Sequence, residues 1–401
     1  MNALYTLTSA LHSEVADEVL KEPFIAGIEH ALGKQFTYFG DDFSTYGTHD
    51  TDIIYIRTGG TEGLFKRLGL TGDIKLLTSG RSNSLAASME ILAYLRSRGQ
   101  SGEILHGSPA SLAARIAETT VGLAEHFTRS RDELSRSVDF VMPMPEIDLK
   151  GIRLGVIGRP SDWLIASEVD YQQVKARLNA DLIDIPIDEL IAETTVGLAE
   201  HFPRSKDELS RSVKERMKTI EGSEAIYEAL KRICRKYRLG GLTIRCFDLL
   251  DTLHNTGCLA LARLNAEGIP SSCEGDIPAL LTMAWLQQTK GRTGFQCNLS
   301  RIEGDRLLFA HCTVPLNMVR SYRYDTHFES GIGTAIKGEF EERGISIYKF
   351  APDLRTMVII PGKIIKNLSE KSLCRTQILV EAPGAAEYML RHPLANHHVL
   401  A

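Results

Sequence analysis

The sequence predicts an α/β protein with two open, parallel-sheet domains of the flavodoxin or Rossmann type, followed by a C-terminal antiparallel β-barrel. Up to about residue 290, short β-branched runs alternate with helical patterns, which is typical of parallel sheets covered by helices. From Arg292 onward helical patterns become sparse, and β-rich runs separated by Gly, Asp and Pro indicate a sandwich or barrel. With a further break at residues 142–145 (MPMP), we expect domains at 1–148, 149–290 and 291–401.

Composition and charge exclude several classes of function. The chain has 401 residues, 43% hydrophobic and 24% charged, which indicates a globular protein with more than one core. A net charge of −5 provides no basic surface for nucleic acid, and no apolar run reaches membrane-spanning length. The seven cysteines are odd in number and show no C-x-x-C spacing, which favours reduced thiols. Because the N-terminus also lacks the pattern of a secretory signal, we expect a cytoplasmic protein with neither nucleic acid nor membrane as partner.

The first expected domain alternates strands with helices. Its Gly-containing turns at 59–62 and 79–84 match neither the dinucleotide-binding fingerprint nor the P-loop. We interpret both as strand-to-helix turns that could line a cleft. The strands are expected at 52–58, 74–78 and 103–106, and a helix at 85–95.

The second expected domain has strands at 152–158, 181–187 and 242–247. Its first strand ends at residues 159–163 (RPSDW), where Trp163 beside polar groups could flank a sugar. The alternative, a tryptophan packed on a domain surface, is the commoner arrangement.

The third expected domain is rich in short strands with a single helix near its end. The strands are expected at 307–312, 345–350, 356–360 and 376–380, and the helix at 385–391.

A segment of 23 residues, 116–138, recurs at 191–213 with only Thr128/Pro203 and Arg131/Lys206 differing. Both copies have helical patterns. Two copies so far apart do not form a solenoid, and their surroundings differ, so the repeat has no functional interpretation here.

Residues 268–278 (GIPSSCEGDIP) indicate the main candidate site. The pattern predicts a short strand, a loop and a helix, with helices at 258–266 and 277–288 on either side. Glu274 and Asp276 then lie between the carboxyl end of a strand and the amino end of a helix, where ligands bind in α/β sheets. The alternative is that Asp276 only caps the helix and Glu274 is solvated.

Histidines from the last expected domain complete a possible donor set. His311 ends a β run, and His397 and His398 are adjacent near the last residue. Because side chains alternate along a strand, only one of the adjacent pair can readily join a site. Imidazoles with carboxylates suit Mn²⁺ or a similar labile divalent ion.

The region from Arg245 to Cys312 and the final segment resemble the L-fucose and L-arabinose isomerase family, closest to its fucose-isomerase-like branch. The resemblance is carried by CFDLLDT at 246–252, CEGD at 273–276, AHC at 310–312 and ANHHVL at 395–400. It implies a metal-dependent aldose–ketose isomerase that acts on a free sugar through an enediolate. It also implies metal ligation by Glu274, His311 and His397, with His398 the less favoured alternative.

The same resemblance implies a homo-trimer or homo-hexamer in which a neighbouring subunit completes the active site. Residues 318–324 and 327–329 could belong to that contact or simply to the barrel surface.

The sequence departs from the family where a second metal-binding acid is expected, because Cys297 and Asn298 stand there. An amide cannot act as a base near neutral pH, so Asp276 is left as the nearest acid to carry a proton. We therefore expect Glu274 and Asp276 in catalysis, and Trp163, Asn298 and His398 at the sugar. The alternative that the departure favours is a catalytically silent relative that binds sugar or has a regulatory role.

Overall fold

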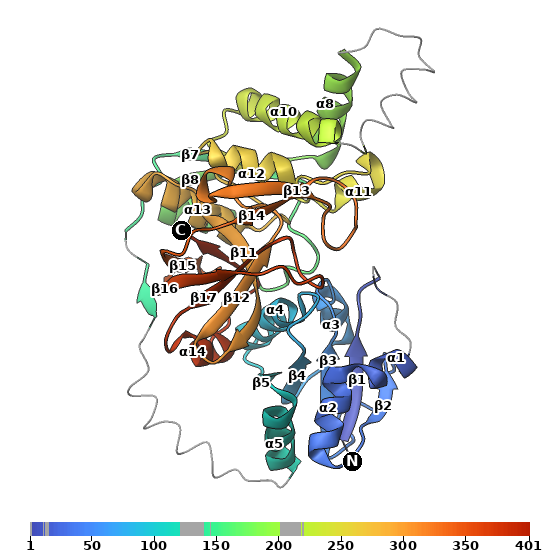
Figure 1. Cartoon of the computed structure of the whole chain (residues 1–401). Coiled ribbons are helices and arrows are strands. Elements are labelled where there is room, and N and C mark those ends of the chain that lie inside the picture. The colour runs from blue at the N-terminus through green and yellow to red at the C-terminus, as the bar shows by residue number, and fades with distance from the viewer. Residues whose placement is uncertain are drawn as a thin grey trace.

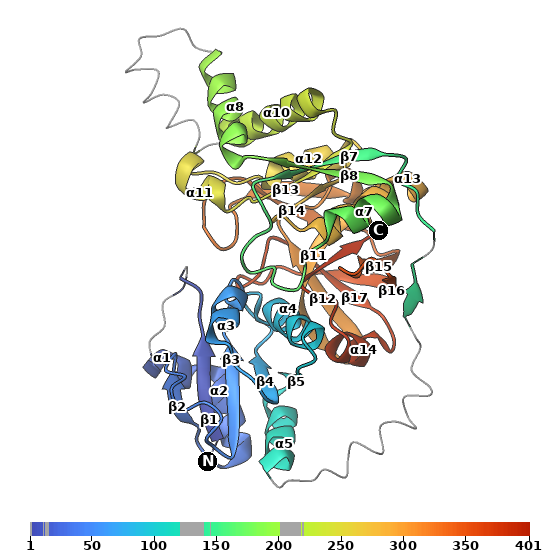
Figure 2. The same cartoon turned by 180° about the vertical axis from the view of Figure 1, so that it is seen from behind.

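The computed structural model describes residues 2–10, 12, 16–120, 140–144, 146–200, 218 and 220–401 (Figures 1 and 2). It contains two parallel sheets and a closed antiparallel barrel of six strands, which confirms the predicted fold class. The domain boundaries expected from the sequence remain a prediction.

The first sheet has five parallel strands in the order β2-β1-β3-β4-β5. Side chains alternate across it, so Leu4 and Ile53 pack with α2 and α5, whereas Tyr5 and Ile54 belong to the core that includes α4. The two strands β1 and β2 were not predicted from the sequence. The elements are β1 Asn2–Leu7, α1 Ala16–Lys21, α2 Pro23–Leu32, β2 Thr37–Gly40, β3 Thr51–Ile56, α3 Glu62–Leu68, β4 Ile74–Thr78, α4 Ser84–Ser97, β5 Gly102–His106 and α5 Pro109–Thr120.

The second sheet has four parallel strands in the order β10-β9-β7-β8. Helices α10 and α12 pack on one face, and α7 and α13 pack on the other. The predicted strand at 242–247 ends sooner, at Ile244, because the chain turns there and the Asp248 amide donates to the Arg245 carbonyl at 3.2 Å. The elements are β7 Ile152–Ile157, α7 Tyr171–Leu178, β8 Ala180–Ile185, α8 Ile187–Glu200, α10 Ile220–Tyr237, β9 Gly241–Ile244, α11 Asp248–Leu253, α12 Cys258–Ala266, β10 Ser271–Ser272 and α13 Ile277–Lys290.

The barrel runs in the order β15-β18-β11-β12-β17-β16 and closes by pairing β15 with β16. The connection between the two parallel sheets contributes a short extra strand, β6, which pairs with the first residues of β16. A separate hairpin, β13 with β14, lies next to it. The elements are β6 Val141–Pro143, β11 Phe295–Glu303, β12 Arg306–His311, β13 Ser321–Asp325, β14 Ala335–Glu339, β15 Gly344–Phe350, β16 Thr356–Asn367, β17 Thr376–Glu381, α14 Ala385–Arg391 and β18 His397–Leu400.

The barrel packs against both parallel sheets. Leu85 and Leu92 of α4 share one apolar core with Phe295 and Phe309 of the barrel, so α4 lies between the first sheet and the barrel (Figure 1). Leu280 of α13 shares another core with barrel residues. Burial of such apolar surface fixes the three units around a common junction.

The repeated segment falls mostly outside the described residues. Of its two copies, residues 116–120 lie in α5 and residues 191–200 lie in α8, and both are helical as expected. The remainder of each copy, 121–138 and 201–213, is not described. In the described part of the chain, no helix has the length and apolar character needed to cross a membrane.

Candidate functional site

A cavity of about 370 Å³ lies where the two parallel sheets and the barrel meet. The two glycine-containing turns that were expected to line a cleft contribute Gly59, Gly60, Glu62 and Asn83. Such a junction between packed units is a usual position for a small-molecule site. The remaining lining residues are Ser9, Ala10, Ala86, Ala87, Trp163, Phe247, Asp248, Leu250, Asp251, Glu274, Asn298, Glu329 and Asn396.

The Glu274 loop follows β10 and leads directly into α13, as the sequence predicted. Glu274 and Gly275 both have positive φ, 64° and 73°. A Cβ on Gly275 would lie 2.5 Å from the carbonyl oxygen of Arg159, so only glycine fits. Asp276 caps α13 by accepting the Ala279 amide at 2.7 Å. The tight turn therefore holds Glu274 at the cavity while Asp276 stays behind it.

Three neighbouring barrel strands deliver the histidines and Asn298. Asn298 of β11 pairs with His397 of β18 on one side and with Ala310 of β12 on the other. His311 follows Ala310, so both imidazoles reach the same end of the barrel. Their Nε2 atoms lie 3.4 Å (His397) and 3.6 Å (His311) from Oε1 of Glu274. The structure thus brings together Glu274, His311 and His397.

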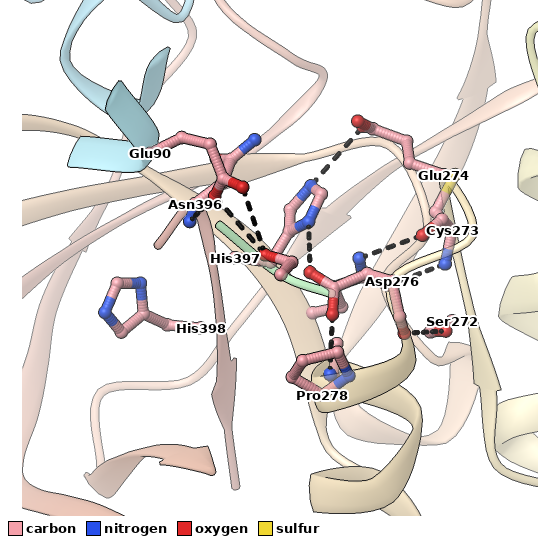
Figure 3. A network of polar contacts seen from close by, with 12 residues as sticks. Glu90, Ser272, Cys273, Glu274, Asp276, Pro278, Asn396, His397 and His398 are labelled. Atoms are coloured by element: carbon pink, nitrogen blue, oxygen red, sulfur yellow. Dashed lines mark hydrogen bonds and ion pairs between the residues drawn. The ribbon is translucent and has the colours of Figure 1, made fainter. Parts of the chain in front are cut away.

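Both imidazoles are oriented by a second contact at Nδ1. His397 Nδ1 lies 2.9 Å from Asp276 Oδ2, and His311 Nδ1 lies 2.9 Å from the Thr313 hydroxyl (Figure 3 shows the former). Each Nε2 is thereby turned toward Glu274. The other carboxylate oxygen of Glu274 accepts a 2.5 Å hydrogen bond from the indole N–H of Trp163.

Charges around Glu274 favour its ionised form. Burial alone would raise the pKa of the Glu274 carboxyl, but His397 and His311 hold it well below its usual range. Burial would lower the pKa of His397, but the Glu274 charge and the hydrogen bond to Asp276 raise it to about 10. Lys349, fully buried and donating to the His397 carbonyl at 2.6 Å, adds to the positive charge that lowers the pKa of Asp276.

The arrangement fits a divalent ion. Donor atoms of Cys273, Glu274 and His311 lie within 4.8 Å of one another. The buried Nε2 of His397 has no hydrogen-bond partner among the described residues, although it faces the same carboxylate. Imidazoles that ligate metals are usually held, as these are, by a partner at the remote nitrogen.

Cys273 was not predicted as a donor, although it directly precedes Glu274. Its sulfur lies 3.1 Å from that of Cys246, and this contact together with burial raises the pKa of the Cys273 thiol well above its usual range. Because thiolates are the form that binds metals, Cys273 is the weakest of the candidate donors.

The structure separates the other expected site residues into two groups. Trp163 and Asn298 line the cavity, and Oδ1 of Asn298 has no partner in the described part of the chain. Asp276 and His398 are not among the described residues that line it. His398 points to the opposite side of β18 from His397 and packs on Phe309 at a ring separation of 6.2 Å (Figure 3). Asp276 is fully buried beneath His397.

Four further acids line the cavity that the sequence analysis did not select: Glu62, Asp248, Asp251 and Glu329. The pKa values of Glu62 and Glu329 are raised. Glu62 begins α3 and is only 1% exposed, and burial raises its pKa well above the usual range. Glu329 lies between β13 and β14, two strands that were not predicted. Glu62 could have been found from its place after a predicted strand, whereas residues 327–329 were considered only as part of a subunit contact or of the barrel surface.

No protein-family model matches the chain. The chain is similar to a curated protein described as a sulfoquinovose isomerase from Alkalicoccus urumqiensis, with 24% identity over 248 residues. The match covers 57% of this chain and 49% of that protein, so the chain spans about half the length of its curated relative. The similarity is therefore to a sugar isomerase in general, and the narrower fucose and arabinose isomerase family is not confirmed.

Proposed function

We propose that this chain is a divalent-metal-dependent aldose–ketose isomerase that acts on an uncharged sugar. The observation that carries the proposal is that two buried imidazoles face one oxygen of Glu274 at the edge of a cavity of sugar size. The distant similarity to a sugar isomerase supports the same reaction class.

Glu274, His311 and His397 are the proposed ligands, and Mn²⁺ is the proposed ion because the donors are nitrogen and oxygen. When bound, such an ion supplies a Lewis acid that stabilises negative charge on adjacent sugar oxygens. The protein residues hold the donors in place: Asp276 orients His397, Thr313 orients His311, and Trp163 orients the Glu274 carboxylate. We therefore revise the expected role of Asp276 from proton carrier to positioning residue.

The cavity wall favours an uncharged substrate. Five carboxyl groups line it, and none of the described lining residues is Lys or Arg. A phosphate or sulfonate would meet like charges without a cation to pair with. Trp163 and Phe247, in edge-to-face contact at 4.9 Å, provide an apolar surface for the carbon face of a sugar ring. Carboxylates accept hydrogen bonds from sugar hydroxyls, and protonated carboxyl groups donate to them. The five lining carboxyl groups are Glu62, Asp248, Asp251, Glu274 and Glu329.

A catalytically silent sugar-binding protein is the second candidate. The observation in its favour is Asn298, which occupies the cavity where the resembling family carries an acid. A silent relative of this kind would retain the metal ligands and the cavity but would not catalyse the isomerisation.

The proposal is tested by metal analysis and turnover of the purified full chain. We expect Mn²⁺ to bind with one ion per chain and to support interconversion of at least one neutral pentose or hexose. Anionic sugars of the same length should react more slowly. Stoichiometric metal and sugar binding without conversion of any neutral sugar would favour the silent relative, and no metal binding would end both metal-based proposals.

Oligomeric assembly stays a proposal drawn from the family resemblance. We expect a homo-trimer or homo-hexamer, which light scattering of the purified chain would measure. A monomer with full activity would contradict a subunit-completed site.

A further inference from the structure

The proposed reaction needs a group that carries a proton between two neighbouring sugar carbons, and the expected residues do not supply one. Asn298 lacks a titratable group near neutral pH. Asp276 is fully buried, caps α13 with one oxygen and holds His397 with the other. The Glu274 carboxylate already contacts the imidazoles of His311 and His397 and the indole N–H of Trp163. The carrier must come from elsewhere on the cavity wall.

Resting on the proposed function, we infer that Glu329 is this catalytic residue, replacing the acid that is absent at Asn298. Glu329 lines the same cavity as Glu274 and Asn298. It lies on the loop between β13 and β14, a different loop from the one that carries Glu274.

The loop that carries Glu329 is held firmly. The His327 amide donates to the Ile332 carbonyl at 3.0 Å, and the Gly331 amide donates to the His327 carbonyl at 2.9 Å. The His327 ring packs edge-on against Phe247 at 5.5 Å, which joins the loop to the cavity wall. Gly333 allows a close approach, because a Cβ there would lie 2.6 Å from the Thr256 hydroxyl. The carboxylate therefore has a defined position.

The surroundings of Glu329 suit proton transfer. One oxygen accepts a 2.8 Å hydrogen bond from Asn83 Nδ2, and no other hydrogen bond to this carboxyl group is found within the described residues. Burial and the nearby Glu274 charge raise its pKa to about 7. Three other titratable groups interact electrostatically with the Glu329 carboxyl group. They are His311, the last residue of β12, Cys312, which follows it, and Glu62 of α3. A base with a pKa near the working pH is the most effective proton carrier.

Glu62 is the rival acid and is the weaker candidate. Its carboxyl group is buried, and burial raises its pKa well above the usual range, which favours the protonated form and the role of hydrogen-bond donor to a sugar hydroxyl.

The proposed step balances within the sugar. In the aldose-to-ketose direction the Glu329 carboxylate takes the proton from C2. The electrons of that C–H bond form the C1–C2 double bond, and the π electrons of the C1 carbonyl move onto O1, which gives an enediolate. The same carboxyl group returns the proton to C1 as the carbonyl forms at C2, and the proton of the C2 hydroxyl passes to O1. C1 is reduced and C2 is oxidised, so no external oxidant or reductant is required.

The test compares Glu329→Gln with wild type and with Glu339→Gln, a matched carboxyl-to-amide change on the exposed part of the same hairpin. Gln can still accept the Asn83 hydrogen bond, so the loop should keep its position while the base is lost. We expect kcat to fall about 10²- to 10⁴-fold. Mn²⁺ affinity and sugar affinity, measured by calorimetry, should stay within about threefold, and Glu339→Gln should behave as wild type. Wild-type kcat/KM should fall below a pH of about 7 as Glu329 takes up a proton, and this decline should be absent from the residual activity of Glu329→Gln.

Each other outcome is decisive. Wild-type turnover that Glu329→Gln retains within threefold would overturn the role of Glu329 and leave the isomerase proposal standing. Weakened metal or sugar binding in Glu329→Gln, with kcat unchanged at saturation, would make it a binding residue. Metal-loaded wild type without turnover would end the proposed function and this inference with it. If Glu329→Gln does not fold, Glu329→Asp decides: we expect at least tenfold lower kcat with the acid-side decline retained.

Discussion

The loop that carries Glu274 and the loop that carries Glu329 bring carboxyl groups to one cavity in opposite electrostatic states. Glu274 has three donors around it and a pKa held well below the usual range. Glu329 has the single donor Asn83 and a pKa raised to about 7. Pairs of acids whose surroundings separate their pKa values commonly divide the work of ligand and proton carrier. The surroundings of each carboxyl group, rather than its residue type, therefore assign these two roles.

The largest effect on metal binding and activity is expected when the charge of Glu274 is removed. Glu274→Gln removes the negative charge of the carboxylate that both imidazoles face, so Mn²⁺ binding should be lost and isomerase activity should become undetectable. Metal analysis after dialysis measures this, with Glu339→Gln as control. Full metal occupancy in Glu274→Gln would contradict the proposed ligand set.

Glu90, a third buried acid, tests whether a raised pKa by itself identifies a catalytic group. Glu90 of α4 is fully buried, accepts the amides of Ala166 and Asn396, and has a pKa raised to about 7 by burial. It is not among the described residues that line the cavity, so we expect its titration to affect stability.

The direction of the pH dependence of stability follows from the raised pKa of Glu90, because the folded state binds this proton more tightly than the unfolded state does. Wild-type stability should fall as the pH rises from about 4.5 through 7, by up to about 3 kcal/mol from this group. Glu90→Gln should lack that part of the slope, which chemical unfolding at pH 5, 6, 7 and 8 would measure. Parallel slopes for the two proteins would show that Glu90 does not hold its proton in the folded state.

A smaller effect is expected at the positioning residue of the Glu274 site. Asp276→Asn keeps a good helix cap but weakens the contact that orients His397. Mn²⁺ affinity should fall about 10- to 100-fold. Stability should fall as well, because the buried Lys349 loses the negative charge that lies 3.9 Å from its Nζ. Asp276→Ala should show the same loss of affinity and an additional destabilisation of about 1 kcal/mol from the missing cap. Unchanged affinity in both variants would leave Asp276 with capping alone.

The smallest effect is expected from returning an acid to position 298. Asn298→Asp adds a carboxylate to the cavity that Glu274 and Glu329 also line, and Mn²⁺ affinity should rise roughly tenfold. In that background Glu329→Gln should cost less activity than it does alone, because the new acid can share the proton transfer. Equal losses in both backgrounds would show that position 298 and Glu329 act independently.

Local patterns in the sequence predicted the Glu274 loop and much of the fold. The helices at 258–266 and 385–391 and the strand at 74–78 were predicted with the bounds that the structure has. These succeeded because apolar spacing, caps and turns depend on near neighbours. Strand alternation also anticipated that only one of His397 and His398 would face Glu274.

Only the tertiary structure decided which acids face the cavity. Asp276 sits two residues from Glu274, yet it is covered by His397 and Lys349, whereas Glu329, 55 residues further along the chain, reaches the cavity. In the hairpin that carries Glu329, β13 is mostly exposed and has no strong apolar alternation. The position of the loop depends on packing against Phe247 and Thr256. Burial and the charges of distant neighbours set the pKa of a carboxyl group, and both arise from long-range packing that local sequence does not encode.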